Sequence, residues 1–205
     1  MPEKTVLGLT GKSCSGKDEA AKILAERGWE IIDVDSLGHQ ALVQRKADIV
    51  QRFGERVLGS SGEVDRRRLG KIVFADSREL HDLEAIVHPE MRQKVKELIE
   101  SGTGQRKICI NAALLFYMKL HLECDGVILV TAPLVLRFIR AKKRDRLPAL
   151  HILRRFAGQR TLFPKHLQKD VDMYIVRNCG SRMRLKKRLE TKLGEYGLIN
   201  EKTVG

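Results

Sequence analysis

The sequence predicts an α/β fold in which a parallel sheet is covered by helices. Strand-like apolar runs alternate along the chain with segments of helical periodicity. The runs are mostly apolar throughout, as expected of strands buried on both faces. With 205 residues, 42% of them hydrophobic, the chain is long enough to form one sizeable core. We therefore expect a single domain over residues 1–205, built on a five-stranded parallel sheet.

Five segments are predicted to be strands. The first covers residues 5–10, and after a glycine-rich turn a helix over 19–27 follows, which Gly28 ends. The remaining strands are predicted at residues 29–33, 107–112, 126–130 and 173–176.

Residues 36–101 contain no strand-like run of comparable quality. Their periodicity predicts helices at 36–44, 46–53, 66–74, 79–87 and 90–100. Pro89 lies between the last two, where a proline suits the start of a new helix. This stretch is too long for a simple crossover between two strands. We expect it to form a helical insertion that contacts substrate.

A glycine-rich run directly after the first strand predicts a phosphate-binding loop. It consists of Gly11, Lys12, Ser13, Cys14, Ser15, Gly16 and Lys17, in the pattern G-x-x-x-x-G-K. Glycines allow the backbone to approach a polyphosphate closely, and the positive end of the following helix faces the anion. Lys17 can reach the terminal phosphates, so we expect this loop to bind a nucleotide.

Asp18 follows the loop at a position where a Ser or Thr hydroxyl commonly binds Mg²⁺. A carboxylate there either repels phosphates, which makes the loop a mere turn, or ligates the magnesium itself or through water. Asp is also favourable in the first turn of a helix. We favour the magnesium interpretation.

Asp33 and Asp35 lie at the carboxyl end of the predicted second strand. If this strand neighbours the first, both carboxylates lie beside the phosphate loop, at the edge where open α/β sheets bind ligands. Alternation along the strand would give the two side chains related directions, one for magnesium and one to accept a hydroxyl proton. The alternative is structural, since Asp35 or Ser36 could cap the next helix.

The net charge of +13 raises the question of nucleic acid as a partner. One group of basic residues lies between 134 and 160. The other, between 177 and 192, is predicted to be the solvated face of a helix with Met183, Leu185, Leu189 and Leu193 inside. Aromatic residues for base stacking are scarce in both groups, so we expect no nucleic-acid partner.

Nothing in the sequence predicts a membrane anchor or a disulfide framework. No apolar run approaches the ~20 residues that span a bilayer, and the N-terminus lacks a signal-peptide pattern. The four cysteines are far apart, and Cys109 and Cys179, in or beside strands, are expected to be buried thiols. We expect a cytoplasmic protein that is a monomer or a weak homo-oligomer.

Read in order, the motifs resemble those of dephospho-coenzyme A kinases, P-loop kinases that phosphorylate the ribose 3′-hydroxyl of dephospho-CoA with ATP. The resemblance extends from about residue 6 to residue 189. It is carried by Gly8 to Gly11, Gly16-Lys17, Asp33-Val34-Asp35, Phe53-Gly54, Gly62 to Arg66 with Leu69, Val73-Phe74, Leu83 to Pro89, Arg92, Leu114-Leu115-Phe116, Arg140, Arg144-Asp145, Arg155, Gln159 and Asn178 to Ser181.

The resemblance implies a three-layer P-loop kinase fold with a helical substrate-binding insertion (36–101), a helical lid (134–160), and ATP and Mg²⁺ at the site. Asp35 would be the general base, and Asp33 would assist through a hydrogen bond or the metal. Arg140 would lie over the transferring phosphoryl group. Further substrate contacts are implied for Thr10, Arg66, His88 and Arg144. His88 also has a structural interpretation, packing at a helix junction.

The chain departs from the family pattern at Asp18, Ala113, Tyr117 and Arg137, the last of which stands where a Gln is usual. These departures affect the expected metal geometry and the surroundings of the site. Two other functions remain open at this point. One is a P-loop kinase for another small hydroxyl substrate, such as a nucleoside, and the other is a basic nucleic-acid-binding module.

Overall fold

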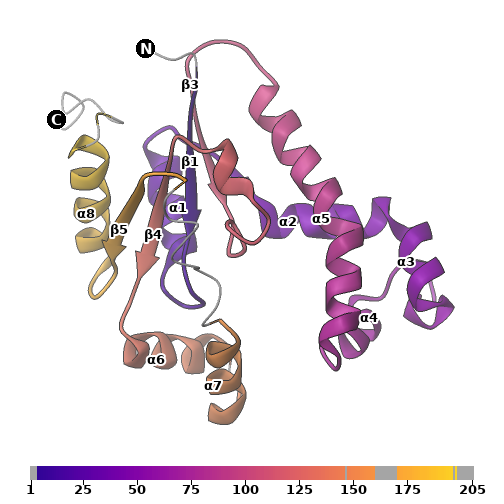
Figure 1. Cartoon of the computed structure of the whole chain (residues 1–205). Coiled ribbons are helices and arrows are strands. Elements are labelled where there is room, and N and C mark those ends of the chain that lie inside the picture. The colour runs from indigo at the N-terminus through magenta and orange to yellow at the C-terminus, as the bar shows by residue number, and fades with distance from the viewer. Residues whose placement is uncertain (1–3, 146, 160–169, 196, 198–205) are drawn as a thin grey trace. The chain divides into compact units, whose positions relative to one another are not determined.

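The computed structural model describes residues 4–145, 147–159, 170–195 and 197. Five strands form one parallel sheet with the order β2-β3-β1-β4-β5, which confirms the predicted α/β class (Figure 1). The strands are β1 (Lys4–Thr10), β2 (Glu30–Asp33), β3 (Arg106–Asn111), β4 (Gly126–Thr131) and β5 (Met173–Arg177). The sequence left open that the first and second strands are neighbours. They are not, because β3 lies between β1 and β2.

Strand β1 occupies the centre of the sheet. Leu7 pairs in register with Cys109 of β3, and Leu9 pairs with Ile128 of β4. All four side chains are buried, as expected for strands covered on both faces.

One face of this sheet is covered by α1 (Lys17–Glu26) and α8 (Arg182–Glu195). Leu185, Leu189 and Leu193 of α8 are buried at four-residue spacing. Met183 was predicted to join them, but it is 79% exposed, because a residue two positions before Leu185 lies on the opposite side of a helix.

The opposite face of β1 packs closely at Gly8. A Cβ at this position would lie 2.7 Å from a methyl group of Leu115 and 3.0 Å from one of Val127, so any larger residue would require these side chains to shift. Leu115 belongs to the segment that follows β3 and leads to the short 3-10 helix η2 (Leu120–Glu123). The second helical layer of the three-layer prediction stays a prediction.

Contacts between Cα atoms divide the chain into two units, residues 33–100 and the remainder. The 33–100 unit is helical: α2 (Val34–Gln44), α3 (Lys46–Phe53), η1 (Glu55–Val57), α4 (Arg66–Val73) and α5 (Ser77–Glu100). A single antiparallel bridge, between Leu58 and Val64, interrupts it. The substrate role of this region remains a prediction.

The predicted helix break at Pro89 is wrong, since α5 runs continuously through it. Val87, Met91, Val95 and Ile99 form one buried face at four-residue spacing on both sides of the proline. Pro89 itself is exposed and lacks only its own N–H bond. Burial of the apolar face therefore outweighs the local preference for a break.

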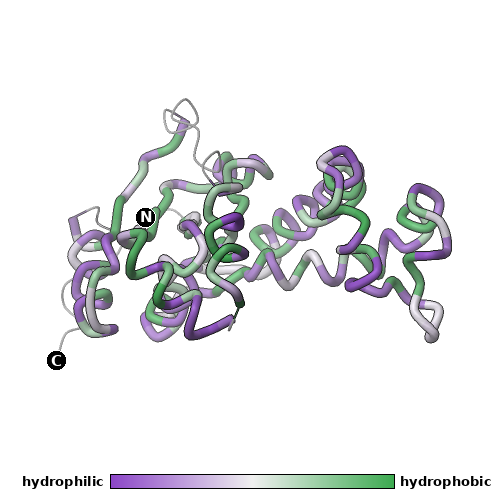
Figure 2. The backbone as a smooth tube through the Cα atoms, turned by 90° about the horizontal axis from the view of Figure 1, so that it is seen from below, coloured by the Kyte–Doolittle hydropathy of each residue, from purple (hydrophilic) through white to green (hydrophobic). Residues whose placement is uncertain are grey.

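Two helices, α6 (Leu134–Asp145) and α7 (Ala149–Gly158), follow β4. They pack through Ala141, Ile152 and Phe156, with Cys14 of the glycine-rich turn and Phe138 against this small core. In Figure 2, green and purple alternate along the coils of the helices, as expected for amphipathic helices. Within the described ranges, no helix combines the length and apolarity that crossing a bilayer requires.

Candidate active site

The predicted phosphate loop connects β1 to α1 through a turn that requires glycine at both ends. A Cβ on Gly11 would lie 2.5 Å from Oγ of Ser15 and 2.6 Å from the carbonyl oxygen of Val130. Gly16 has a φ of 97°, and a Cβ there would overlap the side-chain amide of Asn178. Between them, Cys14 also adopts a left-handed backbone, with φ 61°.

The N-terminus of α1 opens directly from this loop. Gly16 is the N-cap residue, and no side chain caps the first N–H groups of the helix. Such groups, at the positive end of a ten-residue helix, form a suitable environment for phosphate oxygens. Ser15 adds a buried hydroxyl that has no hydrogen-bond partner in the described part of the chain.

Lys17 is 8% exposed, and its ammonium group lies at the end of β3. Its Nζ donates to Oδ1 of Asn111 at 2.6 Å and lies 3.1 Å from Oδ1 of Asp18. Asn111 is neutral, so it orients the ammonium group without cancelling its charge. The structure thus brings Lys17, Asp18 and the loop together.

Asp18 carries a carboxylate that is 72% exposed in the first turn of α1. Mg²⁺ in phosphate sites is held by one or two protein carboxylates together with phosphate oxygens and water, and the Asp18 carboxylate suits this donor chemistry. The described residues contain no group of three or more His, Cys, Asp and Glu side chains that could hold a metal by themselves.

Arg140 reaches from α6 to the carboxyl half of the loop. Its Nη1 donates to the carbonyl oxygens of Cys14 and Ser15 at 3.4 and 3.3 Å, and its Nη2 donates to Oδ1 and the carbonyl of Asn178. The side-chain amide of Asn178 also donates to the carbonyl of Ser15, at 2.8 Å. The predicted lid arginine therefore lies at the loop.

Arg144 forms its hydrogen bonds with Asp145, although its charge also interacts with Cys14 of the loop and with Asp18. It forms an ion pair with Asp145, Nε to Oδ1 at 2.6 Å, and Arg155 of α7 binds the other oxygen of the same carboxylate at 2.6 Å. Hydrogen bonds from Arg144 and then Arg155 lower the pKa of Asp145 to about 2. Asp145 thereby joins α6 to α7.

Asp33 and Asp35 lie at the junction of β2 and α2. Asp33 is the N-cap of α2, and its Oδ1 accepts a hydrogen bond from the N–H of Asp35 at 3.1 Å. The helix begins at Val34, so the expected strand alternation of the two carboxylates is wrong. The proposed cap, Asp35 or Ser36, is corrected to Asp33, and both aspartates are exposed.

Of the predicted substrate contacts, Arg66 is the first residue of α4 and is exposed. His88 lies half-buried in the middle of α5, where burial lowers the pKa of its imidazole; Glu84 raises this pKa and Arg92 lowers it. Thr10 is fully buried, and its hydroxyl donates to the carbonyl of Ala113 at 3.4 Å. Their substrate roles remain predictions.

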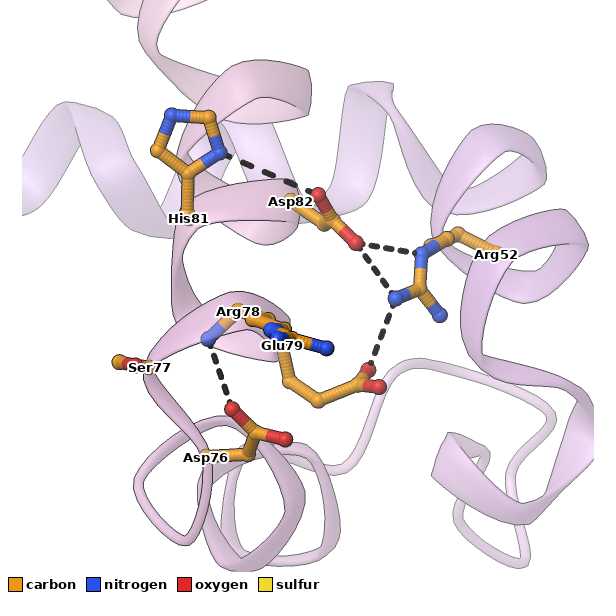
Figure 3. Close-up of a pocket in the computed structure, with 7 residues that line it drawn as sticks. All are labelled: Arg52, Asp76, Ser77, Arg78, Glu79, His81 and Asp82. Carbon is orange, nitrogen blue, oxygen red and sulfur yellow. Dashed lines mark hydrogen bonds and ion pairs between the residues drawn. The ribbon is translucent and has the colours of Figure 1, made fainter.

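A separate polar pocket of 570 Å³ lies at the start of α5, shown in Figure 3. Arg52 of α3 binds Asp82 at 2.9 Å and Glu79 at 3.2 Å across it, and Asp76 accepts from the N–H of Arg78. Arg52 thus pairs with the two acids Glu79 and Asp82, and none of the predicted site residues lines this pocket.

Sequence reasoning assigned no role to Asn111 or Asn178. Each has a recognisable signal, because Asn111 ends β3 and Asn178 directly follows β5, at the carboxyl ends of parallel strands. The cysteine prediction was half right: Cys109 is buried, whereas Cys179 is exposed. Burial raises the pKa of the Cys109 thiol to about 12.

Comparisons with known proteins show the family to which the chain belongs. The sequence pattern of the dephospho-CoA kinase family matches residues 5–183. The dephospho-CoA kinase of Treponema denticola is 31% identical over 204 residues, covering 95% of this chain and 92% of that protein. That of Bacillus licheniformis is 36% identical over 181 residues, covering 86% and 89%.

Solved structures show the same fold. The crystal structure of TT1252 from Thermus thermophilus superposes with a TM-score of 0.78 at 30% identity, covering 94% of this chain and 98% of that one. The dephospho-CoA kinase structure from Campylobacter jejuni, at 22% identity and a TM-score of 0.67, covers 96% and 100% and supports the fold. The chain has a phosphate loop whose Lys17 is hydrogen-bonded to Asn111 at the end of β3, and the family pattern matches most of its length. The chain therefore belongs to the dephospho-CoA kinase family.

Proposed function

We propose that Lys17, Asp35 and Arg140 carry out the reaction of this dephospho-CoA kinase, the last step of coenzyme A biosynthesis. The γ-phosphoryl group of ATP passes to the ribose 3′-hydroxyl of dephospho-CoA, which gives CoA and ADP. The observation that carries the proposal is the phosphate loop, with the buried Lys17 ammonium group held at 2.6 Å from Asn111.

Asp35 is the proposed general base. Its carboxylate takes the proton of the 3′-hydroxyl as the ribose oxygen bonds to the γ-phosphorus. The bond from that phosphorus to the bridging oxygen of the β-phosphate breaks, and ADP leaves. The position of Asp35 in the first turn of α2, with its N–H held by Asp33, supports this role. A positioned base contributes about 10²–10⁴-fold.

Lys17 and Arg140 supply positive charge to the phosphates. Phosphoryl transfer depends mainly on positioning and electrostatic stabilisation. Lys17 is the last residue of the loop itself. Arg140 comes from α6 and is held at the loop by its hydrogen bonds to the carbonyls of Cys14 and Ser15. Thr10, Arg66, His88 and Arg144 remain proposed contacts of dephospho-CoA.

Asp18 is the proposed protein ligand of Mg²⁺, directly or through water, with Asp33 as a second candidate. When bound, the ion neutralises charge on the phosphate oxygens. Asp18→Ser keeps a hard oxygen donor but removes the negative charge, so we expect the Mg²⁺ concentration for half-maximal rate to rise several-fold. An unchanged Mg²⁺ titration in this variant shows that the negative charge of Asp18 is not needed to bind the ion.

Asp35→Asn tests the base. We expect kcat to fall by about 10²–10⁴-fold while the Kd for ATP, measured by titration calorimetry, stays within about twofold. Asp48→Asn is a matched control, since Asp48 is also an acid in the first turn of a helix, paired only locally with Arg45 at 2.9 Å. If Asp35→Asn retains turnover, another residue is the base.

We also propose a cytoplasmic location, and a monomer or a weak homo-oligomer without nucleic acid as a partner. All four cysteines are free, which suits a reducing compartment. Elution volume with light scattering measures the oligomeric state, and a stable large assembly would contradict this part.

A further inference from the structure

Ser13, in the middle of the phosphate loop, is held on both sides of its peptide backbone by side chains of the α6–α7 region. Its carbonyl oxygen accepts from Nε of Arg137 at 2.8 Å, and its N–H donates to Oε1 of Gln159 at 3.0 Å. Nη2 of Arg137 donates to the same Oε1 at 3.3 Å. We call this closed set of Ser13, Arg137 and Gln159 the Ser13 clamp.

Arg137 is a buried cation whose contacts in the clamp are neutral. It is 7% exposed, and its guanidinium carbon lies 4.3 Å from the centre of the Phe156 ring. The carboxylate of Asp145 is bound instead by Arg144 and Arg155, and no acid in the described part of the chain forms an ion pair with Arg137. Burial lowers the pKa of Arg137, against an opposing effect of Cys14.

A buried guanidinium with neutral partners keeps an uncompensated charge at its location. Here that charge lies against the backbone of the phosphate loop. It raises the local potential for an anion, since protein charges in a low-dielectric surrounding act strongly. Arg137 is also one of the positions where the chain departs from the family pattern.

The clamp fixes the residue before the left-handed turn of the loop. Cys14 has φ 61°, an unfavourable conformation for a residue with a Cβ. Both backbone polar groups of Ser13 are bound, so the peptide that enters this turn has one orientation. Arg140 and Asn178 bind the loop at the turn and directly after it, through the carbonyls of Cys14 and Ser15. The two sets of contacts hold different halves of the loop.

We propose that the Ser13 clamp is a positioning device for the phosphate loop, through which Arg137 and Gln159 set the affinity for the nucleotide phosphates. Arg137 is thus a positioning residue and does not act on the transferring group. The proposal rests on the proposed function, in that a nucleoside triphosphate is the ligand of the loop. If a residue holds the loop equally before and during phosphoryl transfer, its substitution raises the KM for ATP and leaves kcat unchanged.

Three variants and a control test the proposal: Arg137→Met, Gln159→Leu, the double variant, and Lys143→Met, which removes an exposed charge from the same helix. The Kd and KM for ATP should rise about tenfold or more in each single variant, with kcat within about threefold. The double variant should be hardly worse than Arg137→Met, because both changes open one clamp. Lys143→Met should change the Kd by less than about twofold.

Arg137→Lys protects the test against a variant that fails to fold. It keeps the charge but lacks the planar fork that reaches both oxygens, so its Kd should lie between those of the wild type and Arg137→Met. A wild-type Kd in Arg137→Lys overturns the geometric role.

Other results overturn the proposal in different ways. Lower thermal stability with an unchanged Kd makes Arg137 merely structural. A loss of kcat with an unchanged KM places it on the transferring group. Independent, multiplicative effects of the two single changes exclude a shared clamp. If the wild type binds ATP but does not convert dephospho-CoA, the proposed function fails, whereas the comparison of Kd values still tests the clamp.

Discussion

Gly16 must be glycine for two reasons, its backbone conformation and the space around it. Its φ of 97° is unfavourable for any residue with a Cβ, and its position against Asn178 leaves no room for one. At Gly28 only the backbone conformation favours glycine, since it has φ 80° and a Cβ there would meet nothing within 4 Å. Comparing substitutions at Gly16 and Gly28 therefore distinguishes the effect of backbone strain from the effect of loop geometry.

Gly28→Ala should lower the free energy of unfolding by about 1–2 kcal/mol, the cost of a left-handed alanine, and Gly16→Ala should lower it by more, because its methyl group also meets Asn178. Only Gly16→Ala should also weaken ATP binding, by about tenfold or more, because the methyl group displaces Asn178 from Ser15. Urea unfolding and calorimetric titration with ATP measure the two effects. Equal ATP affinities in the two variants would show that the Gly16–Asn178 contact does not shape the site.

At the residue scale, the sequence predicted the loop well, because spacing alone specifies where glycines and a lysine must stand. It did not predict the partners of those residues. The 2.6 Å bond from Lys17 to Asn111 joins positions 94 residues apart, and no local pattern encodes such a pairing. The role of Asp33 as a helix cap was missed for a different reason, since cap and strand-end positions favour the same residue type.

Among the elements, α5 shows how tertiary burial outweighs local preference. Pro89 predicts a helix start, yet the buried face from Val87 to Ile99 continues across it. Periodicity on both sides of the proline was visible in the sequence. Whether the two faces align is a question of packing. The 79% exposure of Met183 in α8 has a different origin, since the helical period alone places it on the side opposite Leu185. Boundaries of the remaining strands differ from their predictions by a residue or so.

The ion pairs of Asp145 that join α6 to α7 should weaken at acid pH. The pKa of Asp145 is about 2 in the folded protein and 3.8 ordinarily, so its ion pairs stabilise the fold fully above pH 4. This stabilisation is lost as the pH falls from about 4 to about 2, where the carboxylate becomes protonated in the folded state.

Asp145→Asn should therefore be less stable than the wild type above pH 4, and the difference should shrink toward pH 2. Thermal unfolding across pH 2–6 measures it, with Asp48→Asn as a control for the loss of a partly exposed carboxylate that pairs within its own helix region. A difference between wild type and Asp145→Asn that is constant with pH would contradict the role of these ion pairs.

For the whole molecule, the sequence predicted the class of fold and the order of its elements, whereas the neighbours within the sheet required the structure. Strand order depends on which apolar faces pack together, and β3 rather than β2 lies beside β1. The net charge of +13 is partly accounted for by specific contacts of Arg137, Arg140, Arg144 and Arg155 within the α6–α7 region and the loop. A nucleic-acid partner is not needed to explain these residues.

The most direct measurement is the product formed by the purified protein from ATP, Mg²⁺ and dephospho-CoA, followed by chromatography and phosphorus NMR. We predict one CoA, phosphorylated at the ribose 3′ position, for each ADP released. Release of ADP with dephospho-CoA unchanged, or phosphate transfer to a nucleoside instead, would contradict the assignment.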